Sequence, residues 1–178
     1  MSEAPVVRRV RLHEWAEVRD LRIEAVSDPQ ASIAFLSTRA DELARDEAFW
    51  RERAAGAALG ETAAQFVAVA GGRWVGTATV ILREPGTRDH LDREVDRTRA
   101  DVVGVYLAPQ HRGTGILARL FDQIDAWVAE RGVDALHLDV HVDNLRAQGA
   151  YRKAGFLPTG VTFTSSIGPE LEMRRSRR

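Results

Sequence analysis

Residues 102–115 read VVGVYLAPQHRGTG, and this stretch decides the predicted fold. Its first part, Val102 to Leu107, is rich in β-branched and aromatic residues and favours a short strand. Pro109 ends that strand because proline has no N–H for a sheet ladder. After Gly115 the apolar residues return at helical spacing. They are Ile116, Leu117, Leu120, Phe121, Ile124 and Val128. The sequence therefore predicts a strand that leads through a glycine loop into a helix.

The loop at the start of the predicted helix is suited to bind an anion. Free backbone N–H groups and the positive end of the helix dipole point at one place there, and Arg112 adds a cation. The loop of nucleoside-triphosphate-binding proteins needs a lysine after the glycines, and none follows here. The dinucleotide fingerprint needs a third glycine, but Leu117 and Ala118 occupy that neighbourhood. The sequence thus predicts a site for a phosphate-bearing cofactor and matches neither of these two loops.

A second motif follows downstream. It has the pattern L-x-V-x-x-x-N-x-x-A-x-x-x-Y-x-x-x-G-F and consists of Leu138, Val140, Asn144, Ala147, Tyr151, Gly155 and Phe156. Asn144 and Tyr151 lie on nearly the same face of the predicted helix because of their spacing. Together with the stretch from Leu107 to Leu117, this motif resembles the GNAT superfamily of acyl-CoA-dependent N-acyltransferases. The cofactor loop of that family reads roughly V-x-P-x-x-R-G-x-G-I-G/A, and Leu117 stands where it has a small residue.

The resemblance implies an α/β (α+β) fold. In this GNAT fold a central mixed, mostly antiparallel sheet of about six or seven strands is flanked by about four helices. It also implies a single N-acetyltransferase domain over residues 1–178, with acceptor-side helices in about residues 13–58 and an acyl-CoA-binding core in about residues 65–165. A homodimer is compatible with the same resemblance.

Local patterns predict the remaining elements. A capping box at Thr38 to Asp41 starts a helix that continues through Arg53, and Gly56 and Gly60 are expected to break it. Other helices are expected over residues 13–27 and 144–154, and strands over residues 6–12, 65–70, 74–82, 136–142, 156–165 and 171–174.

Residues 83–99 read REPGTRDHLDREVDRTR and differ from the rest of the chain. They are dense in both charges and poor in apolar residues, so we expect them not to bury themselves. The sequence predicts an exposed, mobile excursion before the central strand. It is either a solvated loop or a segment that closes over the acceptor.

The resemblance implies acetyl-CoA as cosubstrate, bound mainly by main-chain groups. The N–H groups of Gly113 to Ala118 would hold its diphosphate. Val105 to Leu107 would pair with the pantetheine arm, as an extended ligand pairs with a sheet edge. The residues predicted to bind the cofactor are Val105, Tyr106, Leu107, Arg112, Gly113, Thr114, Gly115, Ile116, Leu117, Ala118 and Asn144.

Two residues are candidates for catalysis. Tyr151 would protonate the departing thiolate as a general acid, because a phenol of pKa about 10 is protonated at neutral pH. The alternative is that Tyr151 only packs with Phe156. Asp101 lies at the start of the central strand, where many members of the family carry a glutamate that removes the proton of the amine. The alternative is an exposed strand-end carboxylate. Weaker candidates are His111, His137 and Glu84, or solvent alone.

No metal site is predicted. His137, Asp139 and His141 alternate along one predicted strand and therefore share a face, as metal ligands could. The resemblance implies no metal, however, and a polar strand face is more often solvated or hydrogen-bonded. The chain has no cysteine, which excludes disulfides, thiolate ligands and a cysteine acyl-enzyme.

Composition limits the partners. A net charge of −1 offers no broad field for nucleic acid or an anionic membrane. No apolar run reaches the length of a membrane span and no signal core is found, so we expect a cytoplasmic protein. The acceptor is expected to be a small-molecule amine or a peptide N-terminus, and the mildly acidic acceptor-side helices suit a cation. The sequence favours a direct-transfer N-acetyltransferase, with a non-catalytic acyl-CoA-binding or sensing module as the alternative.

Overall fold

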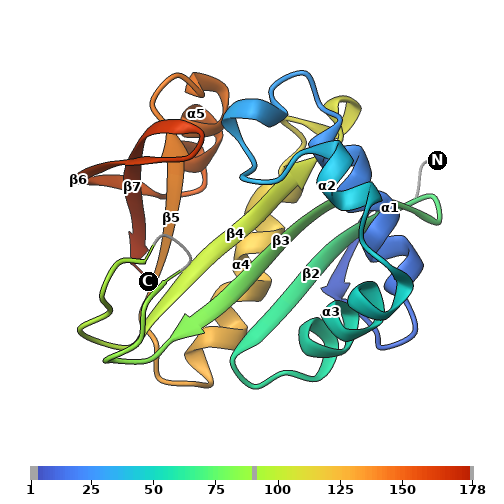
Figure 1. Cartoon of the computed structure of the whole chain (residues 1–178), viewed down its shortest axis with the longest axis horizontal. Coiled ribbons are helices and arrows are strands. Elements are labelled where there is room, and N and C mark those ends of the chain that lie inside the picture. The colour runs from blue at the N-terminus through green and yellow to red at the C-terminus, as the bar shows by residue number, and fades with distance from the viewer. Residues whose placement is uncertain (1–3, 90–91, 177–178) are drawn as a thin grey trace.

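A seven-stranded sheet in the order β1-β2-β3-β4-β5-β7-β6 forms the centre of the computed structural model, which describes residues 4–89 and 92–176 (Figure 1). Only β4 and β5 pair in parallel, and all other neighbours are antiparallel. The mixed, mostly antiparallel sheet is therefore confirmed. The strands are β1 (Val6–Arg9), β2 (Ala63–Ala70), β3 (Arg73–Arg83), β4 (Arg99–Leu107), β5 (Ala135–His141), β6 (Leu157–Ser165) and β7 (Gly168–Ser176).

Helices cover both faces of the sheet, and alternation along β2 shows how. Phe66 belongs to the core cluster that contains α4, whereas Val67 packs with Trp50 of α3. Figure 1 shows α4 behind the sheet and α3 in front of it. The α-helices are α1 (Trp15–Val26), α2 (Arg39–Leu43), α3 (Glu47–Leu59), α4 (Ile116–Ala129) and α5 (Leu145–Lys153), and short 3-10 turns are η1 (Ala31–Ile33) and η2 (Pro109–His111). None of the described helices combines the length and apolar character that a membrane span needs.

The strands β4 and β5 pair only near their starts, at Ala100 with Leu136 and at Asp101 with His137. Figure 1 shows them spreading apart toward their carboxyl ends. A β-bulge adds one residue to β4 opposite Thr77 to Thr79 of β3, and Gly104 at this bulge has a φ of +61°. The bulge bends β4 away from β5, so these two strands separate before the glycine loop begins.

The helix predicted from Thr38 through Arg53 is two helices in the structure. The capping box is confirmed, because Thr38 and Asp41 exchange hydrogen bonds at the start of α2. A second cap interrupts the helix: the Asp46 carboxylate accepts a hydrogen bond from Phe49 N at 2.8 Å and starts α3. The prediction that Gly56 breaks the helix is also wrong, since α3 continues through it to Leu59.

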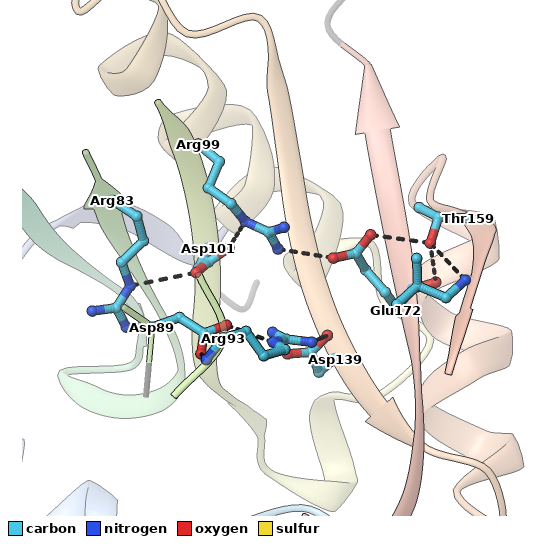
Figure 2. Close-up of polar contacts among 9 residues, drawn as sticks. Arg83, Asp89, Arg93, Arg99, Asp101, Asp139, Thr159 and Glu172 are labelled. Atoms are coloured by element: carbon cyan, nitrogen blue, oxygen red, sulfur yellow. Dashed lines mark hydrogen bonds and ion pairs between the residues drawn. The ribbon is translucent and has the colours of Figure 1, made fainter. Parts of the chain in front are cut away.

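Most of the described residues in 83–99 are exposed, as predicted, but the segment also contains one buried side chain that was not expected. Val95 is only 3% exposed, and its backbone bonds to Gly86 and Thr87. Arg93 lies between two carboxylates, at 2.6 Å from Asp89 and 2.7 Å from Asp139 of β5 (Figure 2). These contacts fasten the segment to the sheet. Residues 90–91 lie outside the described residues.

Candidate active site

A cavity of about 640 Å³ lies where β4 and β5 diverge. Its walls come from the end of β4, the start of α4, the end of β5, and α5. Of the residues predicted to bind the cofactor, all but Thr114 and Ile116 line it. The Thr114 hydroxyl donates to the His111 carbonyl, and the Ile116 side chain is 2% exposed in the core. Two motifs far apart in sequence thus meet around one space.

The start of α4 has the properties of an anion site. Gly113 and Gly115 have φ values of +77° and +83°, a region that favours glycine. Gly115 is the N-cap of α4, and no side chain caps this helix. The N–H groups of its first turn therefore remain available to a ligand. A Cβ built at either glycine would meet nothing within 4 Å, so the loop leaves open space next to these donors.

Arg112 is fixed beside this loop by two contacts. Its Nε donates to the Leu107 carbonyl at 3.0 Å, and a terminal nitrogen contacts the Asp28 carboxylate at 2.5 Å. Burial raises the pKa of Asp28, but hydrogen bonds from Gln30 N and Arg112 outweigh it, and the pKa is lowered. Asp28 is therefore an ionised anchor for Arg112. The contact could not be predicted from the sequence, because no local signal links Asp28 to a loop more than eighty residues away.

Leu117 forms part of the cavity wall. It is half-buried and packs against the core cluster around α4. The cavity keeps its volume beside this side chain. Leu117 is larger than the residue usual at this position, and it narrows the cavity without filling it.

Tyr151 lines the cavity and packs against the rings of Phe121 and Phe156, each with a centroid separation of 6.1 Å. Burial raises its pKa to about 12, and the charge of Arg146 opposes this only in part. The phenol is thus protonated at neutral pH. Its hydroxyl makes no hydrogen bond to any residue that the structure describes, so its proton is available to a ligand.

Asn144 joins two walls of the cavity. Its Oδ1 accepts a hydrogen bond from Ala147 N at 3.1 Å and caps α5. Its Nδ2 donates to the Ile33 carbonyl at 3.4 Å, across the cavity entrance from α5 to η1. The side chain, 3% exposed, is held in place by both contacts.

Asp101 is not brought to the cavity. It is 3% exposed, and its oxygens contact Arg99 at 2.6 Å and Arg83 at 3.4 Å. Arg99 also contacts Glu172 at 3.0 Å, which extends the network across the sheet (Figure 2). The alternative of an exposed strand-end carboxylate is therefore wrong. The structure shows a buried carboxylate held between two arginines.

Two residues that sequence reasoning did not select do line the cavity. Glu170 on β7 is 6% exposed, and its carboxylate has no hydrogen-bond or ion-pair partner within residues 4–89 and 92–176. His141, its cross-strand neighbour, accepts a hydrogen bond from Asp143 N on Nδ1 at 3.1 Å. A neutral His141 therefore carries its proton on Nε2. A Cβ at Gly168 would lie 2.7 Å from that Nε2, so the start of β7 packs tightly against the imidazole.

The alternating side chains of β5 have separate roles in the structure. Asp139 binds Arg93, and His141 bonds to the loop that follows it. Among the described residues no group of three or more histidine, cysteine, aspartate or glutamate side chains is arranged to hold a metal ion.

Comparison with known proteins gives a consistent set of relatives. The model of the acetyltransferase (GNAT) family matches residues 15–156. Aminoglycoside N(6')-acetyltransferase type 1 of Stenotrophomonas maltophilia is 30% identical over 99 residues, which make up 56% of this chain and 62% of that relative. The chain therefore spans less than two thirds of the length of this relative.

Solved structures show the same fold. The acetyltransferase of the GNAT family from Streptococcus pneumoniae superposes with a TM-score of 0.73 at 16% identity, over 98% of this chain and 100% of that chain. AAC(6')-Ib in complex with paromomycin and acetyl-CoA superposes with a TM-score of 0.66 at 21% identity, over 98% of this chain and 94% of that chain. These likenesses confirm the predicted GNAT fold, and the described part of the chain contains five α-helices instead of about four.

Proposed function

Because the chain belongs to the acetyltransferase (GNAT) family, we propose that it moves an acetyl group from acetyl-CoA to a primary amine by direct attack in a ternary complex. The observation that carries this proposal is the cavity itself. It places the uncapped start of α4 and the protonated Tyr151 around one space between two separated strands. The first feature suits the phosphates of an acyl-CoA, and the second supplies a proton for its leaving sulfur.

The cavity fits the cosubstrate at both ends. The first-turn N–H groups of α4 and the guanidinium of Arg112 would bind the diphosphate. The separated edge of β4, from Val105 to Leu107, would pair with the amide groups of the pantetheine arm. Acetyl-CoA supplies the activated acyl group, and the main-chain groups of this chain orient it.

Tyr151 acts as the general acid in this proposal. The amine lone pair forms the new C–N bond, the C–S bond breaks, and the phenol gives its proton to the sulfur that leaves. A phenol with a pKa near 12 is fully protonated at neutral pH, so Tyr151 has a proton to donate as the C–S bond breaks.

Glu170 is better placed than Asp101 to remove the proton of the amine. The Glu170 carboxylate has no hydrogen-bond or ion-pair partner among the described residues, so it is available to a ligand. Glu170 lines the cavity, whereas both oxygens of Asp101 are engaged by arginines. We therefore assign the base role to Glu170 and a structural role to Asp101.

The test combines binding and turnover. We expect acetyl-CoA to raise the melting temperature, as a ligand of the native state must, and we expect free thiol to be released only when a suitable amine is present. Binding without amine-dependent thiol release across a broad panel would favour the sensing module. The absence of any melting shift at millimolar acetyl-CoA would contradict the cofactor assignment.

A further inference from the structure

A second concave surface lies on the acceptor side of the sheet, between α1, α2 and α3. We call it the arginine groove. It has a volume of about 720 Å³. Its charged lining residues are Arg22, Asp41, Glu42, Arg45, Asp46 and Arg53, and Ser37 also lines it.

One buried carboxylate, Glu42, contacts two of the three guanidinium groups in this groove. Glu42 is 2% exposed, and it contacts Arg22 at 2.9 Å, Arg45 at 3.2 Å and the Ser37 hydroxyl at 2.5 Å. Burial raises the pKa of Glu42, but the hydrogen bonds from Ser37 and Arg22 outweigh it, and the pKa is lowered. Glu42 is therefore ionised, and its single charge is already shared between two arginines.

Arg53 is the third guanidinium and has no such partner. It lies 5.7 Å from the ring centroid of Trp50 and forms no hydrogen bond or ion pair in the part of the chain that the structure describes. Burial, and next the charge of Arg22, lower its pKa, and the charge of Glu42 opposes this only in part. Arg53 is therefore a half-buried cation that no direct ion pair compensates.

The remaining acids of the groove do not neutralise Arg53. The Asp41 carboxylate accepts hydrogen bonds from Thr38 at the start of α2, and that of Asp46 accepts one from Phe49 N at the start of α3. Both carboxylates accept hydrogen bonds from helix starts and make no ion pair with Arg53. The three arginines and three acids that line the groove balance in formal charge, but Arg53 has no direct anionic contact among the described residues, and an external oxyanion would supply one.

The arginine groove adjoins the cavity where transfer would occur. Ile33, Ala34 and Phe35 line the cavity, and the next residues, Leu36 and Ser37, line the groove. Arg22 lies over the Phe35 ring at 4.8 Å, and its terminal nitrogen would be 4.0 Å from a Cβ at Gly104. Gly104 is the bulge of β4 and lines the cavity. Arg22 thus connects the arginine groove to the strand along which the acyl group would lie.

We propose that the arginine groove binds an acidic group of the acceptor, so that the acceptor is a primary amine that also carries a carboxylate or a phosphate-like oxyanion. This rests on the proposed acetyl transfer. The amine end would reach the cavity near Glu170, and the oxyanion would pair with Arg53 and the free donors of Arg45. The mildly acidic acceptor-side helices suggested a cation as acceptor. In the groove, however, Glu42 pairs with Arg22 and Arg45, Asp41 and Asp46 accept capping hydrogen bonds, and Arg53 is left without a direct anionic contact among the described residues.

The test compares amines in matched pairs. Amino carboxylates of increasing chain length are measured against their carboxamides, and amino phosphonates against their esters, by acetyl-CoA-dependent thiol release. We expect kcat/KM to favour the acid of a pair by about tenfold or more, as for the gain of a charge-assisted hydrogen bond. Success of the carboxylates or of the phosphonates identifies which oxyanion is bound. Equal rates for acids and neutral partners, or a preference for aminoglycosides, would overturn the proposal.

A binding measurement separates this inference from the proposed transfer. With coenzyme A present, an acidic amine should raise the melting temperature more than its neutral partner, whether or not transfer is observed. Arg53→Gln should remove the preference for the acid in both assays. The control is Arg51→Gln on the same helix, whose side chain is exposed and pairs with Glu47; it should keep the preference. Loss of the preference in both variants, or in neither, would contradict the role of Arg53.

Discussion

Arg93 contacts Asp139 at 2.7 Å, and this pair fastens the charged segment before β4 to the face of β5 (Figure 2). The Arg93 guanidinium also lies 4.3 Å from the ring centroid of Phe163 on β6. One side chain therefore joins a segment without regular structure to two strands. Arg93 explains how a sequence so poor in apolar residues is held in place.

Replacing Arg93 with methionine should destabilise the protein. Removal of one partner of a buried ion pair typically costs about 3–5 kcal/mol. We expect the lower end of this range because the Arg93 side chain is 26% exposed. Urea unfolding measures the change. Arg88→Met, which removes an exposed ion pair with Asp92, is the control and should have little effect.

Asp139 should also make stability depend on pH. Burial raises its pKa above the ordinary value of 3.8, although Arg93 opposes the shift. Between these two pKa values the folded state binds more protons than the unfolded state, so the free energy of unfolding falls as pH rises through that window. Asp139→Asn should flatten this part of the profile, and Arg93→Met should extend it to higher pH. A profile of the same slope in Asp139→Asn and in the unchanged protein would contradict the assignment.

Tyr151→Phe should lower kcat by about 100-fold or more, as expected for loss of a general acid. The rings of Phe121 and Phe156 would still pack against it, so the melting shift with acetyl-CoA should be preserved. Because the pKa of Tyr151 is about 12, the unchanged enzyme should show no loss of activity from this group below pH 10. Unaltered turnover in the variant would remove Tyr151 from the mechanism.

Glu170→Gln and Asp101→Asn separate the two candidates for the base. We expect Glu170→Gln to lower kcat/KM strongly, because the amine then lacks its proton acceptor. Asp101→Asn should lower stability, since Arg83 and Arg99 lose their partner, and should leave kcat/KM largely unchanged. The opposite pattern would return the base role to Asp101.

Gly115→Ala should weaken acetyl-CoA binding and lower stability. The φ of +83° costs an L-residue about 1–2 kcal/mol, and relaxation of the loop would turn the α4 N–H groups away from the cavity. Calorimetric titration with acetyl-CoA measures the first effect and thermal unfolding the second. The control is Gly56→Ala inside α3, where φ is helical and alanine is the better helix former. Unchanged affinity in Gly115→Ala would contradict the loop as a phosphate site.

The local part of the site could be predicted from the sequence, because its signals are contiguous. Pro109 and the glycines mark the strand, the turn and the helix start, and the structure places each in that order. Thr38 and Asn144 cap their helices as their side chains suggest. Asp46 is also a residue type that favours the N-cap position, so the start of α3 could have been predicted from the sequence, but it was not.

The long-range part could not be predicted in the same way. Asp28 and Arg112 meet only because α1 ends beside the loop before α4. Glu170 enters the cavity because β7 lies between β5 and β6, an order that its own residues do not encode. The arginine groove likewise depends on how α2 and α3 pack, whereas the composition of that segment indicated the opposite charge preference.

A crystal structure of the protein with coenzyme A tests the proposed cofactor site. We predict the diphosphate at the first-turn N–H groups of α4, beside Gly113 and Gly115. The pantetheine arm should lie along Val105 to Leu107, with the sulfur next to the Tyr151 hydroxyl. Two results would contradict the proposal that this cavity binds acetyl-CoA. The coenzyme could be bound elsewhere, or the Leu117 side chain could fill the space between β4 and β5 and leave no room for it.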